Sequence, residues 1–263
     1  MRTRNTALVA AMCAGLAAAL AGCGGDDGGG EDPDAGTNGV GKLPATKIES
    51  RARKAAGAAE AVRLSGQLVT KGRTYKVDMR LKADGGTGQV STEGSTFELL
   101  RVGKDLYLKA DAGFWTHKTG NHAGSGAGQN SAGQNSAGQN GAGVGDKLDD
   151  KYVKVPVRDP SYKRLSGLTD KTLLLDGLLG LHGGISTGDR GTVGGVRTIR
   201  IRGGQGSGGT LDVSLEGKPY PLRLQRAGGA GVIRLADWDK DFPLTAPAKD
   251  EVVDYGQQIP SGT

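Results

Sequence analysis

Apolar and polar residues alternate along much of this chain, which is the pattern of strands with one buried face. The clearest run is 75–82, in which Tyr75, Val77, Met79 and Leu81 alternate with charged residues. Successive side chains of a strand point to opposite faces, so such a run has one apolar and one charged face. Similar runs lie within 88–116, 151–157 and 196–235, and Gly-containing turns separate them. The pattern predicts an antiparallel meander.

Two stretches have helical character instead. Residues 46–62 are rich in helix formers and carry small apolar residues on one side, which predicts an amphipathic helix. A Leu-rich helix is predicted downstream, capped by Thr169 or Asp170 and ended by Gly183-Gly184. It is apolar over more than half of its circumference, more than a surface helix needs. Helices and strands in this order predict a single-domain α+β fold, with helices covering one face of an antiparallel sheet.

The first 23 residues have the architecture of a secretion signal. Arg2 and Arg4 precede a short Ala/Leu-rich stretch that ends in Leu-Ala-Gly-Cys. Small residues before a Cys resemble the bacterial lipobox, so we expect lipidation of Cys23 and removal of 1–22. Two or three acyl chains then anchor the protein on the extracytoplasmic face of the cell membrane. An ordinary signal peptide with a coincidental Cys is the alternative. The C-terminal stretch 237–263 contains three prolines and is predicted to be an extended tail.

Glycine is unusually abundant, with 48 of 263 residues. Residues 23–45 are a Gly/Asp-rich run that predicts a flexible tether after the lipidated Cys. Residues 120–147 contain repeats of SAGQN, which lack the apolar surface needed to offset the entropy of ordering, and we expect a disordered insertion. The predicted organisation is a cleaved signal (1–22), a tether (23–45) and one folded domain (46–263) that contains this insertion.

Charge and metal-binding residues exclude several functions. Without Arg2 and Arg4 the chain has 32 basic and 28 acidic side chains, and no basic block of the kind that binds nucleic acid. Cys13 is lost with the signal, so the mature chain has no second Cys for a disulfide. No two of the three histidines have the helical spacing of a zinc site, so we expect no metal and no other cofactor.

Two motifs match the sequence patterns of catalytic or nucleotide-binding sites but lack the predicted elements that such sites need. Residues 184–188 match GxSxG around Ser186, but a nucleophile elbow needs a preceding strand and a following helix, and no His follows His182. Residues 204–209 contain GxGxxG between two strand-like runs, where a hairpin loop is expected rather than the start of a helix. We therefore predict that the protein is not an enzyme.

An apolar sheet face covered by a Leu-rich helix has two interpretations. It can enclose a cavity that suits acyl chains, or it can form a plain packed core. The predicted inward-facing residues, which would line such a cavity, are Tyr75, Val77, Met79, Leu81, Leu99, Leu106, Leu108, Leu174, Leu178, Ile199, Ile201, Leu211 and Val213.

Several motifs, each of low specificity by itself, together resemble those of one family. They include the lipobox, the stretch 102–109 (VGKDLYLK) with the Trp115 that follows, the stretch 151–156 (KYVKVP) and the ending YPLRL…DW…AP within 220–247. They resemble actinobacterial lipoproteins of the LppX/LprG type, over most of 46–255. The resemblance implies a LolA-like half-barrel of antiparallel strands wrapped around helices. It also implies that the protein binds or carries a lipid or glycolipid, with an envelope transporter as a candidate partner. The alternative is a surface interaction or sensor lipoprotein without a lipid cavity.

Overall fold

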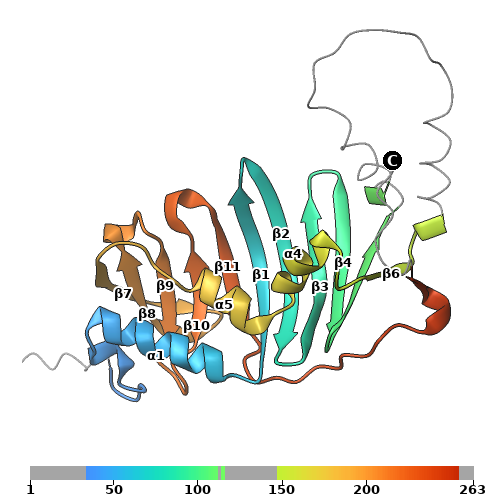
Figure 1. Cartoon of the computed structure of the whole chain (residues 1–263). Helices are drawn as coiled ribbons and strands as arrows, with labels where there is room; N and C mark the ends of the chain where they lie inside the picture. The colour runs from blue at the N-terminus through green and yellow to red at the C-terminus, as the bar shows by residue number, and fades with distance from the viewer. Residues whose placement is uncertain (1–33, 112–113, 116–146, 255–263) are drawn as a thin grey trace, which may run out of the picture.

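The body of the protein is one open sheet with helices on its concave face (Figure 1). The computed structural model describes residues 34–111, 114–115 and 147–254. Within them, twelve strands follow the order β12-β6-β5-β4-β3-β2-β1-β11-β10-β9-β8-β7, so that β12 and β7 are the two edges. All neighbours are antiparallel except β12 and β6, which are parallel. The predicted α+β fold, a curved antiparallel sheet wrapped around helices, is confirmed.

The elements have the following bounds. The strands are β1 (Ala61–Thr70), β2 (Arg73–Lys82), β3 (Gly85–Thr92), β4 (Ser95–Val102), β5 (Asp105–Ala110), β6 (Tyr152–Val155), β7 (Ile185–Val193), β8 (Val196–Gly203), β9 (Thr210–Ser214), β10 (Pro221–Gln225), β11 (Gly231–Ala236) and β12 (Val252–Asp254). The helices are α1 (Ala45–Ala58), α4 (Pro160–Leu168) and α5 (Lys171–Leu178), with short 3₁₀ turns at Val40–Lys42, Gly204–Gly206, Ala227–Gly229 and Lys249–Glu251.

Two-residue turns join the long hairpins. Lys71 and Gly72, between β1 and β2, have φ angles of 50° and 72°. Gly194 and Gly195, between β7 and β8, have φ angles of 58° and 84°. Positive φ at both central residues is typical of the type I′ turn, whose twist matches that of the strands it joins. Both turns contain Gly, as the sequence predicted for the turns between the strands.

Helix α1 is shorter than the predicted helix 46–62. It ends at Ala58, and Ala61 and Val62 already belong to β1. Val62 is β-branched and suits the sheet, where it pairs with Leu81. The buried face of α1 includes Ala52 and Ala56, whose small side chains are 0% and 1% exposed. These small residues allow the helix to lie close to the concave face beneath β7–β10 (Figure 1).

Helices α4 and α5 are held at their junction. Asp170 caps α5 by accepting a hydrogen bond from the Leu173 amide at 2.9 Å. Asp170 is one of the two residues that the sequence predicted as the cap. The other, Thr169, is buried at the end of α4, where Arg101 of β4 donates to its hydroxyl (3.0 Å) and its carbonyl (2.8 Å). A Cβ at Gly86 would lie 3.1 Å from the same Thr169 carbonyl, so glycine permits the close approach of the junction to β3.

A buried lysine connects α5 to α1. Lys171 is 7% exposed, and its Nζ donates to the carbonyl of Gly57 at 3.1 Å and also to the carbonyl of Ala59. These carbonyls lie at the C-terminal end of α1, where backbone oxygens lack helical partners. Burial lowers the pKa of Lys171. The contact joins the start of α5 to the C-terminal end of α1.

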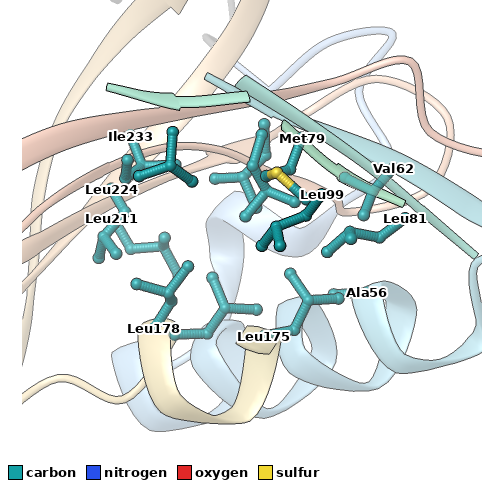
Figure 2. Packing of buried hydrophobic residues seen from close by; sticks show 14 of the residues in the cluster. Ala56, Val62, Met79, Leu81, Leu99, Leu175, Leu178, Leu211, Leu224 and Ile233 are labelled. Atoms are coloured by element: carbon teal, nitrogen blue, oxygen red, sulfur yellow. The ribbon is translucent and has the colours of Figure 1, made fainter. Parts of the chain in front are cut away.

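The hydrophobic core fills the space between the sheet and the helices. Figure 2 shows Leu175 and Leu178 of α5 and Ala56 of α1 pointing toward Met79, Leu99, Leu211 and Ile233 of the sheet. Nearly all of these side chains are fully buried. This packing accounts for Leu175 and Leu178 of the Leu-rich helix but not for Leu173, which is 64% exposed, and the helix ends at Leu178 rather than at Gly183.

The flexible tether was predicted over 23–45, but residues 34–44 are packed against the sheet, and 23–33 lie outside the described residues. Arg190 of β7 binds Asp34 at 2.5 Å, and Arg197 of β8 donates to the carbonyls of Ala35 and Gly36. Asn38 donates to the carbonyl of Ser214, and Val40 is 1% exposed. Specific side chains on β7 and β8 hold this Gly-rich segment, and composition does not reveal them.

Two further regions differ from the sequence prediction. The Gly-containing stretch after the Leu-rich helix forms β7, although six of its nine residues are exposed. The predicted extended tail runs along the sheet, and its Val252–Asp254 pairs with β6. The signal 1–22, Cys23 and residues 255–263 lie outside the described residues, and so does the predicted insertion 120–147 apart from Lys147.

Candidate functional site

The concave face of the sheet is built from cross-strand rows of apolar side chains. One row joins Val62, Leu81 and Leu106, and the next joins Leu64, Met79, Leu99 and Leu108. All seven side chains are 0–1% exposed, because α4 and α5 lie across these rows. The two rows therefore form a closed core.

The rows nearer the β1–β2 hairpin are not closed by the helices. Val77, Val90 and Phe97 form the next row, and Leu68 and Tyr75 form the outermost one. Val90 is buried, whereas the other four are half-buried and pack against the core. We call Leu68, Tyr75, Val77 and Phe97 the open concave rows. They are a partly accessible apolar surface continuous with the core.

Aromatic residues border this surface where β5 ends. Phe114 packs against Phe97 with ring centroids 5.5 Å apart, and its ring is edge-on to Trp115 at 5.2 Å. Trp115 is 2% exposed and donates its indole N–H to the carbonyl of Ala110. The end of β5 is thus anchored by aromatic packing beside the open concave rows.

The predicted lining residues all belong to one cluster, but they differ in accessibility. Three of them, Tyr75, Val77 and Leu174, are half-buried. The other ten are buried against the helices: Met79, Leu81, Leu99, Leu106, Leu108, Leu178, Ile199, Ile201, Leu211 and Val213. The prediction omitted Leu68 and Phe97, although the alternation of Phe97 with Leu99 could have indicated a shared face.

The convex face carries a row of polar and charged side chains. Arg200, Asp212, Arg223 and Arg234 occupy matching positions on β8, β9, β10 and β11, and Asp78 continues the row on β2. Asp212 accepts hydrogen bonds from Arg200 at 2.9 Å and from Arg223 at 2.6 Å. The guanidinium of Arg234 makes no hydrogen bond or ion pair to any residue that the structure describes.

Next to this row lies a hollow of about 640 Å³ on the convex face. Its apolar lining includes Val193, Val196, Leu222 and Trp238. Its cationic lining consists of Arg223, Arg234 and Lys240, and its carboxylate is Asp237. We call this site the convex hollow. The sequence did not reveal it, because its residues come from three separate segments that meet only in the sheet.

Trp238, in the wall of the convex hollow, is held by a polar cluster. Its ring stacks on Tyr220 with centroids 4.6 Å apart, and its Nε1 donates to the carbonyl of Pro221. The Tyr220 hydroxyl donates to Asp239 at 2.5 Å, and the Lys218 Nζ donates to the same oxygen at 2.8 Å. Asp239 also accepts the Glu60 amide, so it ties the start of β1 to this wall.

These contacts predict a specific loss of stability in acid. The ammonium of Lys218, followed by the Tyr220 hydroxyl and the Glu60 amide, lowers the pKa of Asp239 from 3.8 to about 2. A lowered carboxyl pKa contributes stability above pH 3.8, and this contribution is lost as the pH falls toward 2. Urea unfolding at a series of pH values should show this loss in the wild type. Asp239→Asn should be less stable at neutral pH and decline less steeply in that window. Parallel pH profiles would contradict the assignment.

The catalytic and nucleotide-binding motifs have no matching geometry. Ser186 lies within edge strand β7 in register with Arg202, whereas a nucleophile elbow places the Ser at a strand-to-helix turn. The GxGxxG segment forms a 3₁₀ turn between β8 and β9, as the expected hairpin loop. In the described parts of the chain, no group of three metal-ligating side chains gathers. His117 and His122 lie outside those parts. No helix among the described elements has the length and apolarity to cross a membrane.

The fold defines a class of protein with a single open antiparallel sheet and helices on its concave face. No family model matches the sequence, and no curated protein matches it. Among solved structures, LprF from Mycobacterium bovis is similar, with 15% identity, a TM-score of 0.48, and coverage of 78% of this chain and 97% of LprF. The Mycobacterium tuberculosis lipoprotein LppX has 13% identity and a TM-score of 0.41, covering 76% and 99%. An uncharacterized conserved protein from Thermus thermophilus has 11% identity and a TM-score of 0.34, covering 80% and 98%. These similarities concern the fold alone.

Proposed function

We propose that this protein is a lipoprotein anchored through Cys23 to the extracytoplasmic face of the cell membrane, where it binds or carries a lipid or glycolipid. The observation that carries the proposal is the surface of the open concave rows. Four half-buried apolar side chains from β1, β2 and β4 form it, and it is continuous with the core under α4 and α5. An acyl chain laid on this surface would gain about 0.8 kcal/mol for each methylene it buries.

Within this proposal, the thirteen predicted lining residues have two different roles. Tyr75, Val77 and Leu174 contact an acyl chain in the conformation described here, together with Leu68 and Phe97. The ten buried residues contact it only when the helices that cover them, α1, α4 and α5, move away from the sheet. Binding needs no chemical step, so the proposed protein is not an enzyme. A protein of the envelope that donates or receives the lipid, such as a transporter, is the proposed partner.

The close packing of the ten buried residues favours a second candidate function. Ile199, Ile201, Leu211 and Val213 are 0% exposed, so the sheet beneath α1 is closed. A fully packed sheet would suit a surface interaction or sensor module whose partner is a protein or a wall polymer. The two candidates differ in whether lipid accompanies the purified protein.

Val77→Trp tests the lipid-binding surface. Val77 is half-buried and its neighbour on β1 is Gly66, so an indole has room to occupy the surface without entering the core. The full chain, purified in detergent, should crosslink a photoactivatable palmitate analogue on peptides of β1, β2 and β4. The substitution should reduce this labelling several-fold, because the indole occupies the space of the acyl chain.

Val232→Trp is the matched control. Val232 is 40% exposed and pairs with Gln67 on the convex face, so the same substitution leaves the concave face unchanged. Lipid extraction and mass spectrometry of the wild type should show a stoichiometric lipid. A wild type that stays empty after incubation with envelope lipids would favour the interaction module, as would equal labelling in both variants.

A further inference from the structure

The segment that leads to the proposed anchor meets the sheet at one end. Asp34, Ala35 and Gly36 are held by Arg190 and Arg197 near the β7–β8 turn. Only ten residues separate Cys23 from Asp34. A chain of this length reaches roughly 40 Å when fully extended. If Cys23 is lipidated, this end of the sheet stays near the membrane surface.

The convex hollow lies at the same end of the sheet, on the opposite face. Its residues Val193 and Val196 flank the β7–β8 turn, and Thr192 of the hollow pairs with the Arg197 that holds the N-terminal segment. Trp238 and Lys240 follow the end of β11, which finishes at this end too. The anchor segment and the convex hollow are therefore close neighbours.

The lining of the convex hollow has the chemistry of a membrane interface. Three cations line it: Arg223, whose Nε is bound to the buried Asp212 at 2.6 Å, Lys240, which is bound to Asp237 at 2.9 Å, and Arg234. The exposed Arg234 guanidinium has no partner among the described residues. A guanidinium binds a phosphate through two parallel hydrogen bonds, and Trp is typical of the level of the lipid headgroups.

We propose that the convex hollow binds the phosphate headgroup of an anionic phospholipid in the membrane that holds the anchor. Arg234 and Arg223 contact the phosphate, while Trp238, Val193 and Val196 face the upper part of the acyl region. The inference rests on the membrane anchor of the proposed function and not on its lipid-carrying surface. It gives the domain an orientation in which the β7–β8 turn faces the membrane and the β1–β2 hairpin points away from it.

The fluorescence of Trp238 tests this orientation in the lipidated full chain. The protein has two Trp residues, so Trp115→Phe leaves Trp238 as the only reporter. The lipidated protein is reconstituted in vesicles of brominated phosphatidylcholine with or without phosphatidylglycerol, and flotation verifies that each variant is anchored. Bromine should quench Trp238 in vesicles that contain phosphatidylglycerol, and more weakly in neutral vesicles.

Arg234→Glu is the decisive variant and Arg73→Glu its matched control. Both arginines are exposed and without a described partner, but Arg73 lies at the β1–β2 hairpin, at the other end of the sheet. Quenching should fall by about half or more in Arg234→Glu, because the substitution replaces a positive charge beside the anionic membrane with a negative one. It should be unchanged in Arg73→Glu.

Equal quenching in Arg234→Glu and Arg73→Glu would overturn the inference. The absence of quenching in the Trp115→Phe protein that carries neither substitution would also overturn it. Failure to float would overturn the anchor and this inference with it. Labelling by the palmitate analogue is a separate readout. Arg234→Glu should leave that labelling unchanged, so failure of the convex hollow is distinguishable from failure of the lipid-carrying proposal.

Discussion

Gly231→Ala should destabilise the protein by roughly 3–5 kcal/mol, because it places a Cβ where the backbone leaves no space. Gly231 begins β11 with a φ of +111°, which side-chain-bearing residues rarely adopt. A Cβ there would lie 2.0 Å from the carbonyl oxygen of Gln67 and 2.9 Å from the Cα of Leu68. Both are backbone atoms and cannot rotate away. Urea unfolding, followed by far-UV circular dichroism, measures the effect.

The position of Gly231 gives this substitution its large effect. The β1–β11 ladder joins the strands β2–β6 and β12 to the strands β7–β10, and Gly231 pairs with Leu68 within it. Gly228→Ala is the control, since its φ is +62° but no atom lies within 4 Å of the added Cβ. It should cost about 1 kcal/mol, the ordinary penalty of the left-handed region. If the two variants were equally stable, steric pressure at the ladder would not be the cause.

Asp212→Ala should cost about 2–4 kcal/mol, because it removes the shared partner of two arginines. The Asp212 side chain is 3% exposed, whereas those of Arg200 and Arg223 are 33% and 35% exposed. The carboxylate is therefore almost fully shielded, and its hydrogen bonds are made where water cannot replace them. The partly exposed arginines keep access to water, which limits the loss. Chemical unfolding of both proteins at neutral pH gives the difference.

Asp78→Ala is the matched control on the same convex row. Asp78 binds Arg63 at 2.6 Å, but the two side chains are 48% and 39% exposed. An exposed pair of this kind contributes less than about 1 kcal/mol. Equal losses at the two positions would show that burial does not determine the strength of these pairs. Asp212→Ala also affects the convex hollow, because Arg223 lines the hollow and loses its partner in this variant. Asp78→Ala leaves the partner of Arg223 in place.

The two faces of the sheet have different chemistry, and the proposals use them separately. The concave face carries apolar rows that close under the helices and open toward the β1–β2 hairpin. The convex face carries charged rows and, at the opposite end, a hollow near the N-terminal segment 34–36. An acyl ligand suits the first face, and a phosphate headgroup suits the second. A carrier with this arrangement would rest on the membrane by one end and hold its cargo near the other.

Local patterns were sufficient for the elements that depend on neighbouring residues. Alternation of period two predicted β2, β8 and β9, and it placed Met79 and Leu81 on the same buried face as Ile199 and Leu211. Asp170 was predicted as a helix cap because its side chain needs only the next few amides. These features arise within a few residues of one another, so the sequence alone reveals them.

Other features depend on residues that are far apart in the chain. β7 has little apolar content and forms as the partner of β8, while residues 34–44 are ordered by Arg190 and Arg197. Periodicity identified which residues share a face, but only the packing of α4 and α5 showed that Leu99 is closed off and Val77 is not. The convex hollow likewise needs Arg223, Arg234 and Trp238 to meet across β10 and β11. The sequence by itself thus determined most of the strands, the helices α1 and α5, and the apolar face. The tertiary structure decided which part of that face is open, because accessibility depends on which distant segment covers each residue.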